Sequence, residues 1–159
     1  MKYIADFHVH SKYSRATSPE MSPEGIWSWS QLKGIKVVGT GDFTHPGWLA
    51  ELQKKLEPAA EGLYALKKKI RSDALPGSCK TDISFILSAE ISCIYRKNDK
   101  TRKVHCIVIA PAFADALRIN KRLSLIGNLS ADGRPILGLD AKELLKIVIQ
   151  ESPEAMRPK

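Results

Sequence analysis

The strongest constraint on the fold is the order of the first elements that the chain predicts. Residues 3 to 9 alternate apolar and polar side chains, which is the period of a strand with one polar face. A serine and a proline at residues 22 and 23 are typical of a helix start, and Gly34 supplies the stop. Residues 35 to 40 form a short β-branched run. Strand, helix and strand in this order predict a parallel βαβ unit and therefore an α/β fold.

The rest of the chain predicts more helices and strands within one domain. The expected elements are two amphipathic helices over residues 47 to 71, broken near Pro58, a strand over 83 to 87, a hairpin of residues 91 to 96 and 102 to 109, a helix over 113 to 125, and a helix that opens at Asp140. About four or five strands of this kind leave an open sheet with two exposed edges, unless a partner subunit or a further segment completes it.

The polar face of the first strand carries two histidines. Because side chains at i and i+2 of a strand point the same way, His8 and His10 can offer imidazole nitrogens to one ion. Asp6 shares this face and lies deeper, where it either fixes a histidine tautomer or is simply a buried, hydrogen-bonded carboxylate. The pattern favours a metal site whose remaining ligands come from elsewhere in the chain.

Four short segments resemble a known family. Residues 8 to 14, His-Val-His-Ser-Lys-Tyr-Ser, resemble the first motif of the polymerase-and-histidinol-phosphatase (PHP) family of metal-dependent phosphoesterases. Residues 39 to 42, 88 to 90 and 103 to 105 follow in the order of that family's next metal-site segments. Residues 1 to 150 are most similar to the endonuclease Q-like branch, a resemblance that also covers residues 133 to 135. It implies a distorted (β/α)7 PHP-type barrel, incomplete in this chain.

The resemblance also implies a role for each of five residues. His8 and His10 would hold one ion, Glu90 would bridge two ions, and His105 would bind the second. Asp42 would lie near the cluster as ligand or orienter, so that Asp42 and Glu90 are the expected catalytic carboxylates. Imidazole and carboxylate ligands suit Zn²⁺ or Mn²⁺ first, with Mg²⁺ and Fe²⁺ as alternatives.

The chain departs from the family pattern in two places. Phe43 stands where many members have a histidine; His45 either substitutes for that ligand or caps the following turn, and we favour the cap. No histidine follows His105, although the family has later histidine motifs. We therefore expect residues 1 to 152 to form the N-terminal part of a PHP barrel domain and residues 153 to 159 to be an unstructured tail.

Charge indicates a polyanionic partner. Lys and Arg number 25 against 17 Asp and Glu, for a formal net charge of +8. Arg96, Arg102 and Lys103 are candidates for contact with substrate phosphates, and solvated surface is an equal alternative for them. DNA is the expected partner. Three cysteines without a CxxC pair, no signal peptide and no apolar membrane span predict a cytoplasmic protein.

Three functions remain open on the sequence. The leading hypothesis is a metal-dependent phosphodiester hydrolase similar to endonuclease Q, which implies cleavage of the DNA backbone next to deaminated or abasic nucleotides. A PHP phosphoesterase acting on small phosphate monoesters, as histidinol phosphatases do, is the second, and the positive charge disfavours it. A catalytically silent fragment that binds metal or nucleic acid is the third.

Overall fold

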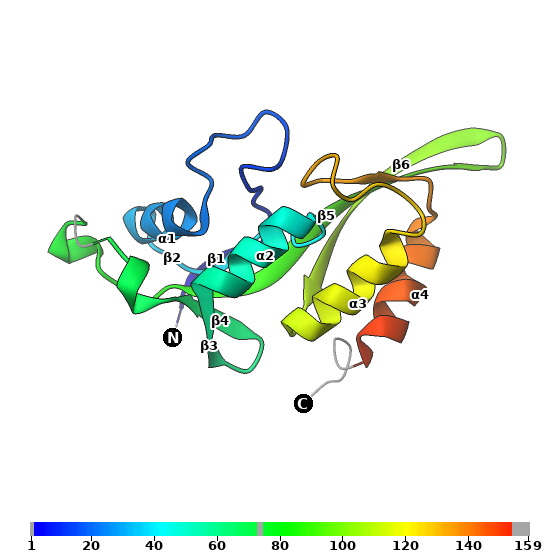
Figure 1. Cartoon of the computed structure of the whole chain (residues 1–159). Helices are drawn as coiled ribbons and strands as arrows, with labels where there is room; N and C mark the ends of the chain where they lie inside the picture. Colours follow the sequence, from blue (N-terminus) through cyan, green and yellow to red (C-terminus); the bar gives the residue numbers. More distant parts are fainter. Residues whose placement is uncertain (1, 73–74, 154–159) are drawn as a thin grey trace.

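The computed structural model describes residues 2–72 and 75–153. It has an α/β fold built on one mixed sheet, with parallel and antiparallel strand pairs (Figure 1). Within these ranges the sheet has seven strands: β1 (Ile4–Asp6), β2 (Ile35–Gly39), β3 (Leu56–Ala60), β4 (Leu63–Leu66), β5 (Ser84–Lys97), β6 (Lys100–Ala110) and β7 (Ile136–Leu137). The four α-helices are α1 (Pro23–Leu32), α2 (Pro46–Lys55), α3 (Phe113–Leu123) and α4 (Ala141–Glu151). An α/β fold was expected, and this part of the expectation is confirmed.

The predicted βαβ unit is present at the start of the chain. Strands β1 and β2 pair in parallel, and α1 connects them. The Ser22 side chain caps α1 by accepting the N–H of Gly25, and Gly34, with a φ of 69°, allows the turn that follows. The first strand is shorter than predicted, because its pairing with β2 ends at Asp6. His8 and His10 therefore lie in the loop after the strand, not on the strand itself.

Strand β5 is the central element of the sheet. The sequence predicted two separate strands here, but Ser84–Lys97 forms one strand of 14 residues. Its first part pairs with β2 in parallel and with β4 in antiparallel orientation, and its second part pairs with β6 and β7. The predicted hairpin turn is confirmed, with Asn98 and Asp99 both in the left-handed region, at φ of 51° and 58°.

The prediction of a second helix before residue 71 is wrong. Strands β3 and β4 form an antiparallel hairpin there instead. Leu56, Tyr64 and Leu66 are buried in the core, and alternate residues of β4 reach it. Pro58 lacks the N–H that a helix interior needs, so an extended strand accommodates it better.

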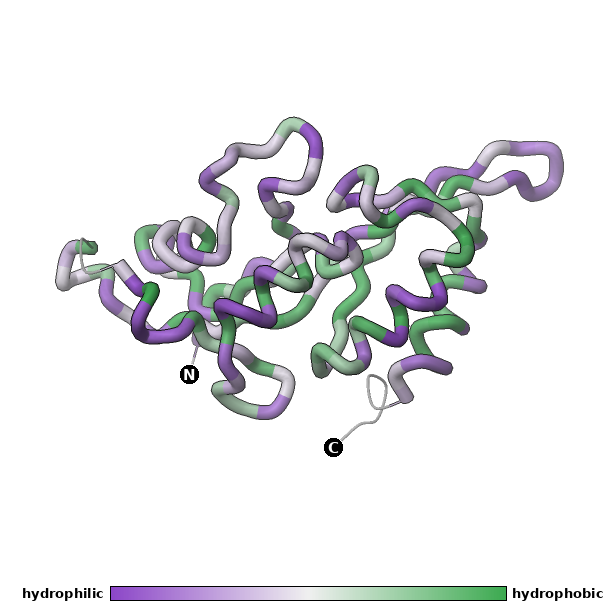
Figure 2. The backbone as a smooth tube through the Cα atoms, in the orientation of Figure 1, coloured by the Kyte–Doolittle hydropathy of each residue, from purple (hydrophilic) through white to green (hydrophobic). Residues whose placement is uncertain are grey.

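The core lies between the sheet and the helices packed on it. Trp48, Phe43 and Phe85 have no exposed surface, and the Trp48 indole N–H donates to the carbonyl of Gly41 at 2.8 Å. Figure 2 shows hydrophobic and hydrophilic residues alternating along α3 and α4, as expected for helices with one buried face. The turn after β2 is thus held by a buried aromatic side chain.

Among the described residues, the strands β1, β3, β6 and β7 each pair with a single neighbour, and β1 and β6 are two of these that carry exposed apolar side chains. Strand β1 pairs with β2, and β6 pairs with β5. Large apolar side chains are exposed on both, including Ile4 on β1 and Ile107 and Ile109 on β6. Among the described residues the sheet thus remains open at these edges, and closure into a PHP barrel stays a prediction.

Two further expectations concern the ends and the surroundings of the protein. Of the expected tail, residues 154–159 lie outside the described residues. Within the described ranges, every helix is too short or too polar to cross a lipid bilayer.

Candidate metal centre

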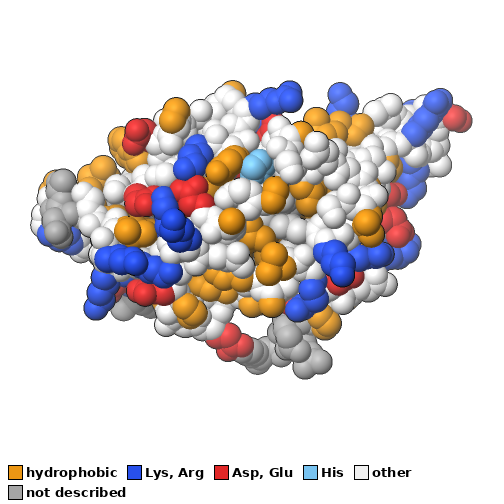
Figure 3. Space-filling view, viewed as in Figure 1, with side chains coloured by type: hydrophobic (Ala, Val, Ile, Leu, Met, Phe, Trp, Pro, Cys, Tyr) orange, Lys and Arg blue, Asp and Glu red, His pale blue; other side chains and the backbone are white. Residues whose placement is uncertain are grey.

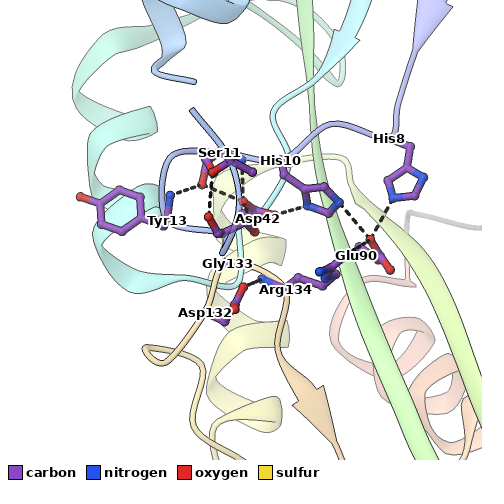
Figure 4. A network of polar contacts seen from close by, with 12 residues as sticks. His8, His10, Ser11, Tyr13, Asp42, Glu90, Asp132, Gly133 and Arg134 are labelled. Atoms are coloured by element: carbon purple, nitrogen blue, oxygen red, sulfur yellow. Dashed lines mark hydrogen bonds and ion pairs between the residues drawn. The ribbon is translucent and has the colours of Figure 1, made fainter. Parts of the chain in front are cut away.

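The predicted metal ligands meet where β1 and β2 end. His8 and His10 come from the loop after β1, Asp42 from the turn after β2, Glu90 from the middle of β5 and His105 from the adjacent β6. Figure 4 shows His8, His10 and Glu90 pointing toward one another. Parallel strands of α/β proteins gather functional groups at their carboxyl ends in this way.

Glu90 lies at the centre of the cluster. Its Oε2 is 2.8 Å from His8 Nε2 and 3.0 Å from His10 Nε2, while its Oε1 contacts Nδ1 of His105. The carboxylate is almost completely buried. Burial opposes its ionisation, but the hydrogen bonds from His8 and His105 prevail and hold the pKa of Glu90 below its usual value. Glu90 is therefore held as a charged carboxylate with imidazoles on both oxygens.

Three of these residues are close enough to share one ion. Ligand atoms of His8, His10 and Glu90 all lie within 4.8 Å of one another. Two imidazole nitrogens and one carboxylate oxygen are a donor set that Zn²⁺, Mn²⁺ and Fe²⁺ accept. His105 is not part of this group, and its contact with the other oxygen of Glu90 is compatible with a second ion.

Asp42 acts on His10 from the side opposite to Glu90. Its Oδ1 lies 3.0 Å from His10 Nδ1. Its Oδ2 accepts the N–H of Ser11 at 2.6 Å, the hydroxyl of Ser11 at 2.7 Å and the hydroxyl of Ser14 at 2.9 Å. Four donors or ring nitrogens surround this fully buried carboxylate, an arrangement suited to orienting His10, and a role of Asp42 as a metal ligand stays a prediction.

The ionisation of the pair follows from these contacts. The hydrogen bond to Asp42 raises the pKa of His10, although burial opposes the shift. Burial also disfavours the Asp42 carboxylate, but the hydrogen bonds from His10, Ser11 and Ser14 outweigh it and lower the pKa of Asp42. A charged Asp42 holds a proton on Nδ1 of His10, which leaves Nε2 as the nitrogen directed at Glu90.

Two glycines allow the loops of the site to approach each other. A Cβ at Gly133 would lie 2.4 Å from Asp42 Oδ2, and the Gly133 N–H donates to the carbonyl of Tyr13 at 3.0 Å. A Cβ at Gly41 would lie 2.3 Å from the carbonyl oxygen of Val9, and Gly41 has a φ of 63°. No larger residue fits at either position without moving backbone or carboxylate.

Arg134 is a site residue that the sequence reasoning missed. Its Nη1 lies 3.8 Å from Glu90 Oε2, and its backbone N–H donates to Oδ1 of Asp132 at 3.0 Å. On the sequence, residues 133 to 135 were noted only as part of the family resemblance. An aspartate that accepts an N–H two residues on is a local signal for a fixed turn, but nothing local indicates that the turn lies beside β5.

Asp6 and His45 lie near the site but hydrogen-bond to groups outside the cluster of imidazole rings and Glu90. Asp6 Oδ1 accepts the backbone N–H of His8 at 3.1 Å and so holds the backbone of the loop. The hydrogen bond observed for Asp6 is thus to a backbone N–H and not to a histidine ring. His45 caps α2, as we favoured: its Nδ1 accepts the N–H of Trp48 at 3.4 Å, and its Nε2 donates to the Ser130 carbonyl at 3.2 Å.

The three basic candidates lie on the exposed part of the β5–β6 hairpin, between His105 and the hairpin turn. Arg96 on β5 and Arg102 and Lys103 on β6 are all exposed. The guanidinium of Arg96 is 3.6 Å from Asp99 Oδ1 across the turn. Their contact with phosphate stays a prediction.

Fold and site together define an α/β protein with a histidine and carboxylate cluster at the carboxyl ends of its strands. Two solved structures are similar to this chain in fold. The lesion-specific endonuclease PfuEndoQ from Pyrococcus furiosus superposes with a TM-score of 0.72 at 28% identity, over 92% of this chain and 32% of that protein. Endonuclease Q in complex with a 27-mer duplex substrate that carries an abasic lesion at the active site gives a TM-score of 0.71 at 28% identity.

One further protein is similar to this chain in sequence. An uncharacterised protein of Methanocaldococcus jannaschii is 29% identical over 144 residues, which are 90% of this chain and 14% of that protein. No protein-family model matches the chain. The chain is thus similar to about a third of the length of endonuclease Q.

Proposed function

We propose that the chain is the metal-binding part of a phosphodiester hydrolase that acts on DNA in the manner of endonuclease Q. The proposal rests on the contacts of the two Glu90 carboxylate oxygens: His8 and His10 contact Oε2, and His105 contacts Oε1. A carboxylate with imidazoles on both oxygens is suited to bridge two cations, and paired cations about 3.5 to 4 Å apart support in-line phosphoryl displacement.

The residues present fit such a centre, and each has a separate task. His8 and His10 would hold one ion together with Glu90, and His105 would add a ligand for the second. Bound divalent ions supply Lewis acidity and lower the pKa of a coordinated water. Asp42 keeps the Nδ1 proton of His10 in place, so that the neutral ring presents Nε2.

The proposed substrate is duplex DNA with a damaged nucleotide. The similar endonucleases are described as lesion-specific and as bound to an abasic duplex. For this chain we extend the proposal to deaminated bases, whose recognition would require extrusion from the stack. A partner subunit or a further segment, paired with β1 and β6, would complete the sheet beside the site.

The test combines cleavage and metal content. Protein loaded with Mn²⁺ or Zn²⁺ is assayed on duplexes with an abasic or inosine nucleotide, on an undamaged duplex and on p-nitrophenyl phosphate. Nicking of the damaged duplexes, abolished in His8→Ala/His10→Ala, supports the proposal. Hydrolysis of p-nitrophenyl phosphate alone would favour the small-phosphoester alternative.

A metal-binding module without turnover is the second candidate. It is favoured by the open edges of β1 and β6 beside the site, and by the exposure of the His8 and His105 side chains, 57% each. Tight metal binding with no cleavage of any of these substrates would support it.

A further inference from the structure

The arm formed by β5 and β6 carries much of the charge of the protein. We define the arm as residues 94 to 105; it projects from the body in Figure 1. Residues 96 to 103 include one acidic residue, Asp99, and five basic residues, Arg96, Lys97, Lys100, Arg102 and Lys103, so this segment accounts for +4 of the formal net charge of +8. Blue side chains mark the arm at the upper right of Figure 3.

Few of these charges are neutralised within the protein. Lys97 Nζ lies 3.5 Å from Asp140 Oδ2, and Arg96 pairs loosely with the fully solvated Asp99. Among the described residues, Lys100, Arg102 and Lys103 have no ion-pair partner. Like charges held close together repel, and an approaching polyanion relieves that repulsion.

The strand register divides the basic residues between two faces. Ser92 lies opposite His105, Ile94 opposite Lys103, and Arg96 opposite Thr101. Directly opposed residues share a face, and faces alternate along each strand. Lys103 and Arg96 therefore lie on the face that also carries His105.

The metal centre lies on that same face. Glu90 is two residues from Ser92 on β5, so it shares the face with Lys103. Lys103 precedes His105 by two residues, a separation of about 7 Å along the strand, and Arg96 lies roughly one such step farther toward the hairpin turn. Lys100 and Arg102 alternate with these residues and lie on the opposite face.

We infer that the face of the arm with Lys103 and Arg96 binds the phosphate backbone of a DNA duplex and leads it to the metal centre. The inference deepens the proposed function and rests on it for the direction of the DNA. Charge, exposure and register support the surface itself.

The test compares two double variants with the same change of charge. Lys103→Glu/Arg96→Glu alters the face of the metal centre, and Lys100→Glu/Arg102→Glu alters the opposite face. Binding of a fluorescein-labelled DNA duplex is followed by fluorescence anisotropy in EDTA between about 50 and 200 mM salt, where each phosphate contact contributes a slope of about 0.9 in log K against log salt. Circular dichroism and thermal melting check the folding of both variants.

We expect Lys103→Glu/Arg96→Glu to weaken binding about tenfold or more and to reduce the salt slope by about 2. The opposite-face variant should lose about threefold at most, because charges beyond about 10 Å are screened. Equal losses in both variants, or no loss in the first, overturn the inference, as does a wild-type protein without affinity for the duplex.

Metal content, measured separately, should be unchanged in both variants. A wild-type protein that binds the duplex but no metal would overturn the proposed hydrolase and still support the DNA-binding surface.

Discussion

The Oδ1 atom of Asp42 lies 3.0 Å from Nδ1 of His10, and the opposite nitrogen of that ring lies 3.0 Å from Glu90 Oε2. A fully buried carboxylate thus fixes the tautomer of a residue that is itself directed at the proposed ion. Three donors on its other oxygen favour the charged form of Asp42.

Replacement of Asp42 tests this orienting role. Asp42→Asn should reduce metal affinity about 10- to 100-fold, because the amide no longer holds the Nδ1 proton of His10 as a carboxylate does. Competition with a zinc chelator measures the affinity. Because the network is buried, Ser14→Ala, which removes one of the three donors to Oδ2, serves as a milder variant with a smaller loss in the same direction. His45→Ala is the control; it removes the cap of α2, should cost about 1 kcal/mol of stability, and should leave metal affinity unchanged.

A methyl group at Gly133 should disturb the same carboxylate. The added Cβ would meet Asp42 Oδ2 at 2.4 Å and Ser14 Oγ at 2.6 Å, so Gly133→Ala should cost about 1 to 3 kcal/mol of stability and weaken metal binding. Urea denaturation and metal titration provide the two readouts. Gly138→Ala is the matched control, because nothing lies within 4 Å of its Cβ. Similar effects of the two substitutions would show that the close approach of Gly133 to Asp42 is unimportant.

The loop that carries Ser11 and Ser14 is tied to α2 by Glu51. The Glu51 carboxylate lies 2.9 Å from Lys12 Nζ and 2.7 Å from Lys55 Nζ. Burial opposes its ionisation, yet the two lysines lower the pKa of Glu51. A lowered pKa in the folded state means that the contribution to stability is full above the unfolded value of about 4.3 and is lost as the pH falls through the folded pKa.

We therefore expect Glu51→Gln to be less stable than the wild type at pH 7, by no more than about 1 kcal/mol because the groups are partly solvated. The difference in melting temperature should shrink as the pH is lowered from 5 to 3. A difference that persists undiminished at acidic pH would rule out this ionic contribution.

Cys93 should be chemically inert in the folded protein. Its side chain is fully buried, and burial, together with the neighbouring Cys106, raises the pKa of the Cys93 thiol to about 12. Cys79 and Cys106 are partly exposed. At pH 8, Ellman's reagent should leave Cys93 unmodified in the native protein and modify all three cysteines in denaturant. Peptide mapping of a native sample that shows labelled Cys93 would contradict the burial described here.

Local sequence signals predicted those parts of the fold that local chemistry determines. Ser22 and Gly34 mark the ends of α1, and the polar residues 97 to 100 mark the turn between β5 and β6. The β3–β4 hairpin was missed because leucines spaced along residues 49 to 66 suit an amphipathic helix as well as two short strands. Pairing of β4 with β5 favours strands over a helix for this segment, and no local pattern encodes that pairing.

In the candidate site too, local patterns were predictable and contacts between distant segments were not. His8 and His10 were identified as neighbours in sequence, although the pairing that ends β1 at Asp6 places them in a loop. Residues whose relevance depends on contacts between distant segments were harder to identify. Arg134 reaches Glu90 from 44 positions away, and Gly133 is needed only because Asp42 occupies the space above it.

The central claim is that Glu90 is shared by two metal-binding positions. Elemental analysis of the wild type and of Glu90→Gln, His105→Ala and His45→Ala, each purified and loaded with Mn²⁺ or Zn²⁺ under the same conditions, tests it most directly. Glu90→Gln should lose metal from both positions, His105→Ala should keep the ion held by His8 and His10, and His45→Ala should match the wild type. Unchanged metal content in Glu90→Gln would contradict the account.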